Sequence, residues 1–395
     1  YNLKQSFAAE VAKNLAISGF TQFHLFDPTN IDSDDIKYGF CYNGMDETMT
    51  RYQVFGDMIR ELNPTATVFQ GDASNLNDID IMILLNQPFE DVINFEKEYH
   101  GKLIAGFCTG VNGFVFTNPK QHITNNVNGE NVSSHNIRSI TFKQEEKESC
   151  AVIETITKHN LSFGDEIIFK NMTLKDDFEF EDAYPVKVIN VYKFSIPISG
   201  GFEFINGSIE KTQPVVVFDK YKSFEEIVAN PVFEGFDHEA SNKVFQSYQH
   251  IMKYLQNQFI PVISVIGGLV SNEVIKLASE KFTPINQILT FGDTSLEKIT
   301  SDGEISQDLY NLISKNNFAM VGCGAIGCEL LKNLVMVGAG SNGYIRVTDP
   351  DHIEKSNLSR QFLFRNCHVG QSKSRIAAMM VQNFRKTKIE TFKNK

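Results

Sequence analysis

The stretch Phe318–Lys332 decides the fold, and it reads Phe-Ala-Met-Val-Gly-Cys-Gly-Ala-Ile-Gly-Cys-Glu-Leu-Leu-Lys. Four residues typical of a buried strand are followed by glycines at Gly322, Gly324 and Gly327 and then by a helix-forming run. Glycines at this spacing let backbone N–H groups and the start of a helix approach a phosphate. An acid, Asp349, closes the next predicted strand and can accept a ribose hydroxyl. The stretch therefore predicts a nucleotide-binding α/β unit.

Two cations follow Asp349 and bear on which nucleotide binds. Arg360 lies on the segment after the predicted strand, and Lys373 lies further on. A nucleophile that attacks the α-phosphate of ATP needs the phosphate charge neutralised as pyrophosphate leaves, which is work for a fixed guanidinium and an ammonium. An NAD-dependent enzyme has no such need, so we favour ATP. The alternative reading is that both cations are solvated surface residues.

The N-terminal part of the chain contains a second, degraded copy of this unit. Asp27–Asp32 aligns with Asp349–Glu354, and Glu10–Leu15 aligns with Glu329–Leu334. Further matched positions are Phe40 with Phe362 and Arg51 with Lys373. Where the second copy has its glycines, the first has Leu3–Ala8, without a glycine. The internal repeat predicts two copies of one nucleotide-type fold, of which only the second binds nucleotide.

Length, charge and cysteine usage narrow the class of protein. The 395 residues suffice for two to four domains at about 100–200 residues each. The net charge of −11 makes nucleic acid and anionic membrane surfaces poor main partners, so we expect neither. The six cysteines form no CxxC pair, which favours a reducing compartment. The apolar run 259–270 is too short to span a membrane and predicts a buried helix.

Several motifs together resemble the eukaryotic ubiquitin-activating enzymes. The segments 322–333, 347–364 and 372–374 closely resemble the active adenylation domain of that family. Leu161–Glu166 resembles the family's inserted first cysteine half-domain. Ile266–Val274, followed by Lys281–Ile285, resembles the return into the inactive adenylation domain. The resemblance therefore covers nearly the whole chain.

The chain pattern predicts an α/β fold with an inserted domain of short β-strands and a polar helical spacer. The resemblance adds that the two repeats are Rossmann-like adenylation domains of the ThiF type. It places the first part of the inactive adenylation domain at 1–118 and the inserted first cysteine half-domain at 119–200. It places the helical spacer at 222–258, the return into the inactive domain at 259–300 and the start of the active adenylation domain at 305–395.

The resemblance also implies a role for each candidate site residue. The adenylate-binding loop would comprise Gly322, Gly324, Ala325 and Gly327. Asp349 would bind the ribose, and the phosphates would be faced by Asn357, Arg360, Gln361 and Lys373, of which Arg360 and Lys373 would be catalytic. The family uses ATP and Mg²⁺ to adenylate the C-terminal glycine of ubiquitin, which then passes to a cysteine as a thioester. We expect no protein metal site and no catalytic cysteine in this chain.

Parts of the family pattern have no counterpart in the printed sequence. The second copy stops before the family's metal-binding aspartate, and neither the thioester-cysteine domain nor the ubiquitin-fold domain is present. We expect an N-terminal portion of such an enzyme, monomeric with an internal pseudo-dimer, cytoplasmic and nuclear, with a ubiquitin-conjugating enzyme as a partner of the full-length protein. The alternatives are activation of another ubiquitin-like or sulfur-carrier protein, and a catalytically silent scaffold that binds ubiquitin-like proteins or nucleotide.

Overall fold

The structure is a computed structural model of the 395-residue chain. It describes residues 3–42, 44–71, 76, 78–129, 133–145, 148–198, 201–213, 215–234, 238–251, 259–292 and 307–392. The predicted domain boundaries at 200, 300 and 305 lie outside the described residues. The chain divides into two compact units. Unit 1 comprises residues 1–122, 218–280 and 284–395, and unit 2 comprises residues 123–217 and 281–283.

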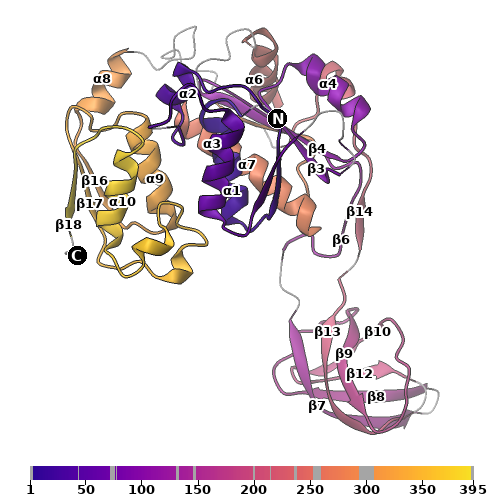
Figure 1. Ribbon diagram of the computed structural model, residues 1–395. Helices are drawn as coiled ribbons and strands as arrows, with labels where there is room; N and C mark the ends of the chain where they lie inside the picture. Colours follow the sequence, from indigo (N-terminus) through magenta and orange to yellow (C-terminus); the bar gives the residue numbers. More distant parts are fainter. Residues whose placement is uncertain are drawn as a thin grey trace. The chain divides into compact units, whose positions relative to one another are not determined.

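The first copy, residues 3–70, begins unit 1 with alternating helices and strands (Figure 1). Its elements are α1 (Gln5–Ile17), β1 (Gln22–Leu25), α2 (Ser33–Tyr38), α3 (Arg51–Leu62) and β2 (Thr67–Gln70). Strands β1 and β2 pair in parallel, with Gln22 opposite Thr67. Helix α3 is well specified because Thr50 and Gln53 form a capping box at its start.

A four-stranded sheet in the order β15-β5-β4-β3 completes the first α/β block. Its strands are β3 (Ile81–Leu85), β4 (Lys102–Thr109), β5 (Asn112–Asn118) and β15 (Ile288–Phe291). The helices of this part are α4 (Phe89–Glu98), α5 (Phe224–Ala229), α6 (His238–Ile251) and α7 (Ile260–Ser279). Because β15 pairs with β5 across about 170 residues of chain, the segment after α7 returns to the sheet that the N-terminal part began.

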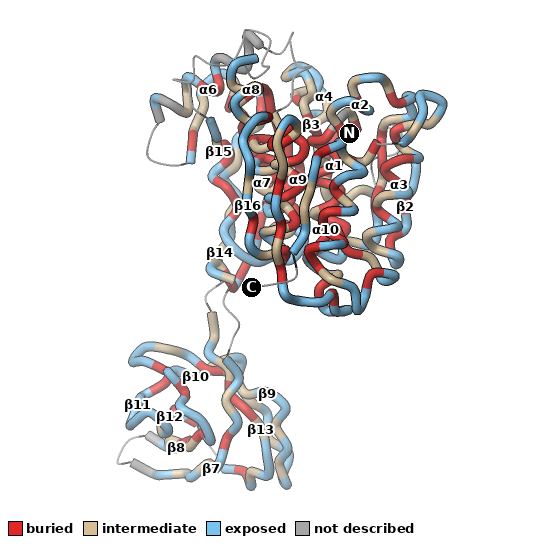
Figure 2. The backbone as a smooth tube through the Cα atoms, turned by 90° about the vertical axis from the view of Figure 1, so that its left-hand side faces the viewer, coloured by how far each residue is buried: buried red, intermediate tan, exposed pale blue. Residues whose placement is uncertain are grey.

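Helix α7 lies in the core of this block. It packs on α1, β4 and β5, and Ile263, Ile266 and Val270 are fully buried (Figure 2). Among the described residues it is the helix that is long and apolar enough to cross a membrane by length and composition, and 56% of its most apolar window is buried. The packing matches the buried helix that its sequence predicts.

The second copy, residues 318–392, has the same alternation of helices and strands as the first. Its elements are β16 (Phe318–Val321), α9 (Ala325–Met336), β17 (Ile345–Thr348), α10 (Lys373–Gln382) and β18 (Ile389–Phe392), preceded by α8 (Gln307–Lys315). Two short 3₁₀ helices, Lys355–Asn357 and Asn366–His368, lie between β17 and α10. The strands form a parallel sheet in the order β16-β17-β18.

Unit 2 consists of antiparallel strands around its own core. The strands are β7 (Ser134–Glu145), β8 (Glu148–Thr155), β9 (Glu166–Leu174), β10 (Tyr184–Pro185), β11 (Lys187–Asn190), β12 (Lys193–Pro197) and β13 (Phe204–Lys211). Two further strands, β6 (His122–Thr124) and β14 (Val216–Phe218), pair with each other. Strand β13 pairs with both β7 and β9, so the sheet continues past residue 200, where the sequence predicted the inserted domain to end.

Candidate functional site

The glycine loop joins β16 to α9 and leaves its surface open. Gly322 has a φ of 99°, a backbone conformation that favours glycine. A Cβ at Gly327 would lie 2.2 Å from the carbonyl oxygen of Gly322, so this glycine is required for the helix to approach the loop. At Gly322 and Gly324, by contrast, an added Cβ would meet no atom within 4 Å. The loop therefore offers backbone groups to a ligand that approaches closely.

Asp349 follows β17 and holds the glycine loop in place. Its Oδ2 accepts the Cys323 N–H at 2.5 Å, and its Oδ1 accepts the Asp351 N–H at 2.8 Å. The residue is buried. The first copy repeats this pattern, because Asp27 accepts the backbone N–H of Leu3 at 3.0 Å. The aspartate of each copy thus anchors the turn that precedes the first helix, a structural role that the sequence did not reveal.

The two predicted catalytic cations differ in their surroundings. Lys373 is the first residue of α10, and its Nζ lies 3.0 Å from Oδ2 of Asp351. The Lys373 side chain is 10% exposed. Arg360 is exposed, its guanidinium donates to the Ser356 carbonyl at 2.8 Å, and no ion pair of the described residues involves it. Arg360 can therefore move toward an anion, whereas Lys373 is already held.

Asn357 and Gln361, which were expected to face the phosphates, are buried. Oδ1 of Asn357 accepts the Glu354 N–H at 3.0 Å and thereby closes the 3₁₀ turn. Oε1 of Gln361 is buried, and no described residue donates to it. Both residues support the turn that carries Arg360, and Gln361 has an acceptor still to be satisfied.

The equivalent place in the first copy is filled by the chain's own ion pairs. Arg51, the counterpart of Lys373, is buried against Asp35, with 2.7 Å between Nη2 and Oδ2. The same guanidinium lies 2.9 Å from Asp32, and Lys4 lies 3.1 Å from Asp32. The Arg51 guanidinium is thus held by two carboxylates of its own copy, whereas Lys373 has one carboxylate partner, Asp351, and Arg360 has none among the described ion pairs. The contrast agrees with the expectation that only the second copy binds nucleotide.

The cysteines near the site are poor nucleophiles. Burial raises the pKa of the Cys323 thiol to about 12, with a further contribution from Asp349 that Lys373 partly opposes. Burial likewise raises the pKa of Cys328 to about 12. Because the thiolate is the reactive form, both thiols are inert at neutral pH.

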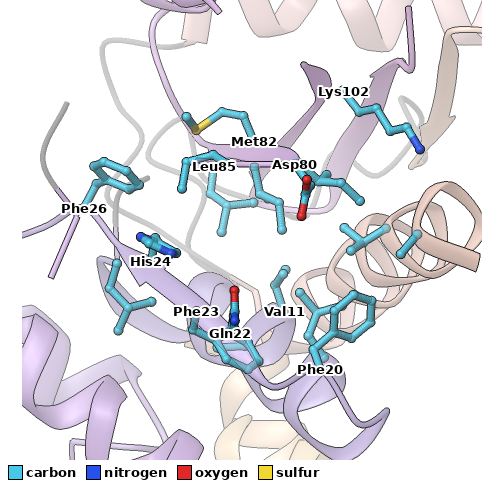
Figure 3. A pocket seen from close by; sticks show the side chains of 18 of the residues that line it. Val11, Phe20, Gln22, Phe23, His24, Phe26, Asp80, Met82, Leu85 and Lys102 are labelled. Carbon is cyan, nitrogen blue, oxygen red and sulfur yellow. The ribbon is translucent and has the colours of Figure 1, made fainter. Parts of the chain in front are cut away.

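A separate cavity of 430 Å³ lies in the first α/β block, between β1 and β3 (Figure 3). Its walls are mainly apolar side chains from α1, α7 and the two strands, with Asp80 and Lys102 at its polar side. The Lys102 ammonium donates to the Leu277 carbonyl at 2.8 Å. None of the predicted site residues lines this cavity, so it is distinct from the glycine loop.

The C-terminal quarter of the chain is similar to a known protein family. Residues 297–395 match the ThiF family. This segment is similar to ThiF-family domains and is called the ThiF domain below. The ThiF domain thus includes the glycine loop, Asp349, Arg360 and Lys373. The ThiF domain accounts for a quarter of the chain. The other three quarters are covered by similarity to longer proteins.

The whole chain is similar to ubiquitin-activating enzymes. It is 27% identical to ubiquitin-like modifier-activating enzyme 1 of Dictyostelium discoideum, with 96% of this chain and 45% of that protein covered. It is also 27% identical to the protein of that name in Homo sapiens, with 94% and 43% covered. The chain spans less than half the length of these relatives. Among solved structures, Escherichia coli TcdA in complex with ATP is 20% identical, with 22% of this chain and 35% of TcdA covered and a TM-score of 0.21.

Proposed function

We propose that the second copy binds ATP and transfers its adenylyl group to the C-terminal carboxylate of ubiquitin or a related modifier protein. The observation that carries the proposal is the open glycine loop, together with two cations that follow it in the same α/β unit. An added Cβ at Gly322 or Gly324 would meet no atom within 4 Å, Lys373 pairs with Asp351, whose N–H donates to Asp349, and Arg360 is exposed without a carboxylate partner among the described ion pairs. Similarity to ubiquitin-activating enzymes supports the choice of protein substrate.

The reaction follows from where the charges lie. A carboxylate oxygen of the modifier protein attacks the α-phosphorus of ATP, the bond from this phosphorus to the bridging oxygen breaks, and pyrophosphate leaves with the electron pair. Arg360 and Lys373 stabilise the negative charge that moves onto the leaving group and the equatorial oxygens. The glycine loop N–H groups and the start of α9 orient the phosphates. Asp349 holds the loop and can accept a ribose hydroxyl as well.

Magnesium would rely mainly on ATP for its ligands, because no group of three or more His, Cys, Asp or Glu side chains gathers in the described part of the chain. Asp351, the carboxylate beside Lys373, is paired with that lysine. Magnesium is commonly bound through substrate phosphates and one or two carboxylates, so ATP would bring most of its ligands. No step proposed for this chain depends on a protein-held metal.

The later steps of the proposal concern a longer protein of this type. There the adenylate would pass to a cysteine thiol as a thioester, and a ubiquitin-conjugating enzyme would receive the modifier. Four of the cysteines are unsuited to that step, because burial raises the pKa of Cys323, Cys328, Cys41 and Cys108. We propose that the protein acts in the cytoplasm and nucleus, where its free cysteines would stay reduced.

The test is a glycine substitution that affects the ligand and leaves the fold alone. Gly324 has an ordinary backbone conformation and open space around it, so Gly324→Ala should fold normally and lose at least about tenfold in ATP affinity, since the new methyl group meets the phosphates. Gly268→Ala on α7, also with open space around the added methyl, is the matched control and should bind ATP normally. Titration calorimetry with ATP measures both variants.

A second measurement separates adenylation from simple binding. Pyrophosphate exchange into ATP should occur only when ubiquitin or a related modifier is added. Unchanged ATP affinity in Gly324→Ala would contradict the site. ATP binding without modifier-dependent exchange would instead indicate a nucleotide-binding scaffold.

A further inference from the structure

Four charged side chains meet where α1 of the first copy packs against α9 of the second. Lys13 and Lys332 are 1% and 0% exposed. Each lysine pairs with the glutamate three residues before it, Lys13 with Glu10 at 2.9 Å and Lys332 with Glu329 at 3.0 Å. Each also pairs with the glutamate of the other helix. We call Glu10, Lys13, Glu329 and Lys332 the interface cluster.

The interface cluster is reciprocal because its members occupy matched positions of the internal repeat. Glu10 corresponds to Glu329, and Lys13 corresponds to Lys332. Two positive and two negative charges lie together, so the cluster is neutral as a whole. Glu10, Lys13 and Lys332 are almost fully buried, whereas Glu329 is 35% exposed. An unpaired charge among the three buried side chains costs several kcal/mol, so their positions depend on one another. Burial lowers the pKa of Lys13, and Glu329 opposes that shift.

Lys13 makes a second contact with the ThiF domain. Its Nζ lies 4.5 Å from the centre of the Phe362 ring, within the range of a cation–π interaction. Phe362 is buried and follows Arg360 by two residues. Lys13 therefore contacts both sides of the candidate site: Glu329 lies on α9, which begins at the glycine loop, and Phe362 lies on the segment that carries Arg360.

The corresponding contacts of Lys332 with the first copy do not reach an open nucleotide site. Lys332 lies 5.2 Å from the centre of the Phe40 ring, the counterpart of Phe362, and 5.7 Å from the centre of the Phe362 ring, to which Lys13 is nearer. The first copy has no glycine loop, and its cation Arg51 is already bound by carboxylates. A nearly symmetric set of contacts therefore acts on an open site only in the second copy.

We propose that Lys13 of the degraded first copy is a positioning residue for the nucleotide site of the second copy, because it ties Glu329 of α9 to Phe362 and so sets the spacing between the glycine loop and Arg360. The degraded copy then contributes to adenylation although it binds no nucleotide. This inference rests on the function proposed above.

The test compares two buried cations of the first copy in the full 395-residue chain. Lys13→Met removes the contact to the ThiF domain, whereas Arg51→Met removes a buried cation whose ion pairs all lie within the first copy. Amide hydrogen exchange, without nucleotide, should rise at least about tenfold in Ala325–Leu331 and Arg360–Phe364 for Lys13→Met and stay near the unmodified rate for Arg51→Met. ATP affinity should fall about tenfold or more for Lys13→Met only.

A double variant with swapped charges distinguishes a positioning role of Lys13 from a general loss of stability. In the double variant Lys13→Glu with Glu329→Lys, α1 carries two glutamates and α9 two lysines, so every pair across the interface keeps opposite charges. Amide exchange in Ala325–Leu331 should return toward that of the unmodified chain because the charge pair with α9 is restored, whereas exchange in Arg360–Phe364 should stay raised because a carboxylate does not replace the ammonium over the Phe362 ring. Lys13→Glu alone should raise exchange in both segments. Equal rates of amide hydrogen exchange in these two segments for Lys13→Met and Arg51→Met would overturn the inference. A chain that keeps these exchange differences but binds no ATP would instead overturn the proposed function.

Discussion

Asp349 and Asp27 occupy equivalent places in the two copies, and each accepts the backbone N–H of the preceding turn. Asp349→Ala should lower ATP affinity about tenfold or more, because a charge-assisted hydrogen bond is worth about 1.5–3 kcal/mol and the Cys323 N–H is left without its acceptor. Asp27→Ala should destabilise the first copy and leave ATP affinity unchanged. Calorimetric titration of both variants checks the prediction, and parallel losses in the two would argue against a site confined to the second copy.

Arg360 and Lys373 distinguish adenylation from binding. If both stabilise charge that develops at the α-phosphate, Arg360→Ala or Lys373→Ala in a complete enzyme should slow adenylate formation about 10²–10³-fold while ATP binding falls less. Rapid-quench measurement of the adenylate, beside an ATP titration, reports both quantities. Equal losses in rate and binding would indicate ordinary phosphate contacts. The Lys373 variant also loses its partner Asp351, so Arg360→Ala is the cleaner of the two.

The cysteines lead to a negative prediction. Incubated with ubiquitin and ATP, this chain should form no adduct that a thiol reductant removes, because burial keeps the thiols at the site protonated. Alkylation at neutral pH should modify the exposed Cys367 and spare Cys323 and Cys328. Mass spectrometry resolves both outcomes. A reductant-sensitive ubiquitin adduct would show that a thiol of this chain is reactive after all.

At the scale of elements, the approach of α7 to α1 depends on one glycine of an adjacent pair. A Cβ at Gly267 would lie 2.9 Å from Cβ of Glu10, whereas a Cβ at Gly268 would meet nothing within 4 Å. Gly267→Ala should destabilise the protein by about 1–3 kcal/mol through overpacking. Gly268→Ala should stabilise it by about 0.5–1 kcal/mol, since alanine is the better helix former. Opposite shifts in denaturant midpoint are expected, and equal shifts would mean that α7 does not approach α1 this closely.

Polar contacts between α1, α7 and α9 fix the position of these helices relative to one another. Ser264 of α7 contacts both copies, since its hydroxyl lies 3.2 Å from Glu10 and 2.9 Å from Asn333. A polar residue of the long apolar helix therefore joins the interface cluster. The Ser264 hydroxyl is half-buried and makes both contacts only when all three helices are in place.

At the scale of the whole molecule, the two units have separate cores. The core of unit 2 contains Phe194, Ile153 and Ile167, and it shares no residue with the cores of unit 1. Phe194→Ala should cost unit 2 about 3–5 kcal/mol and leave ATP affinity at the second copy unchanged. Scanning calorimetry should show one transition moved to lower temperature and another retained. A single transition that moves as a whole would mean that the units unfold together.

The similarity between the two α/β segments and the glycine loop could be recognised from the sequence alone, because both depend on local spacing. The sequence predicted that the inserted domain ends at residue 200, and this boundary leaves out strand β13. The pairing of β13 with β7 and β9 joins distant parts of the chain, so no local sequence pattern indicates it.

The alignment of Glu10 with Glu329 and of Lys13 with Lys332 was visible in the sequence, but it indicated only similarity between the copies. That these residues face one another and neutralise each other in a buried place was decided by the packing of α1 on α9, which brings together side chains more than 300 positions apart. The burial of Gln361 and the filling of the first copy's site by Arg51 were decided in the same way. Residue types and spacing determine which chemistry is available, whereas burial and partner choice depend on contacts that form only when the helices and sheets pack.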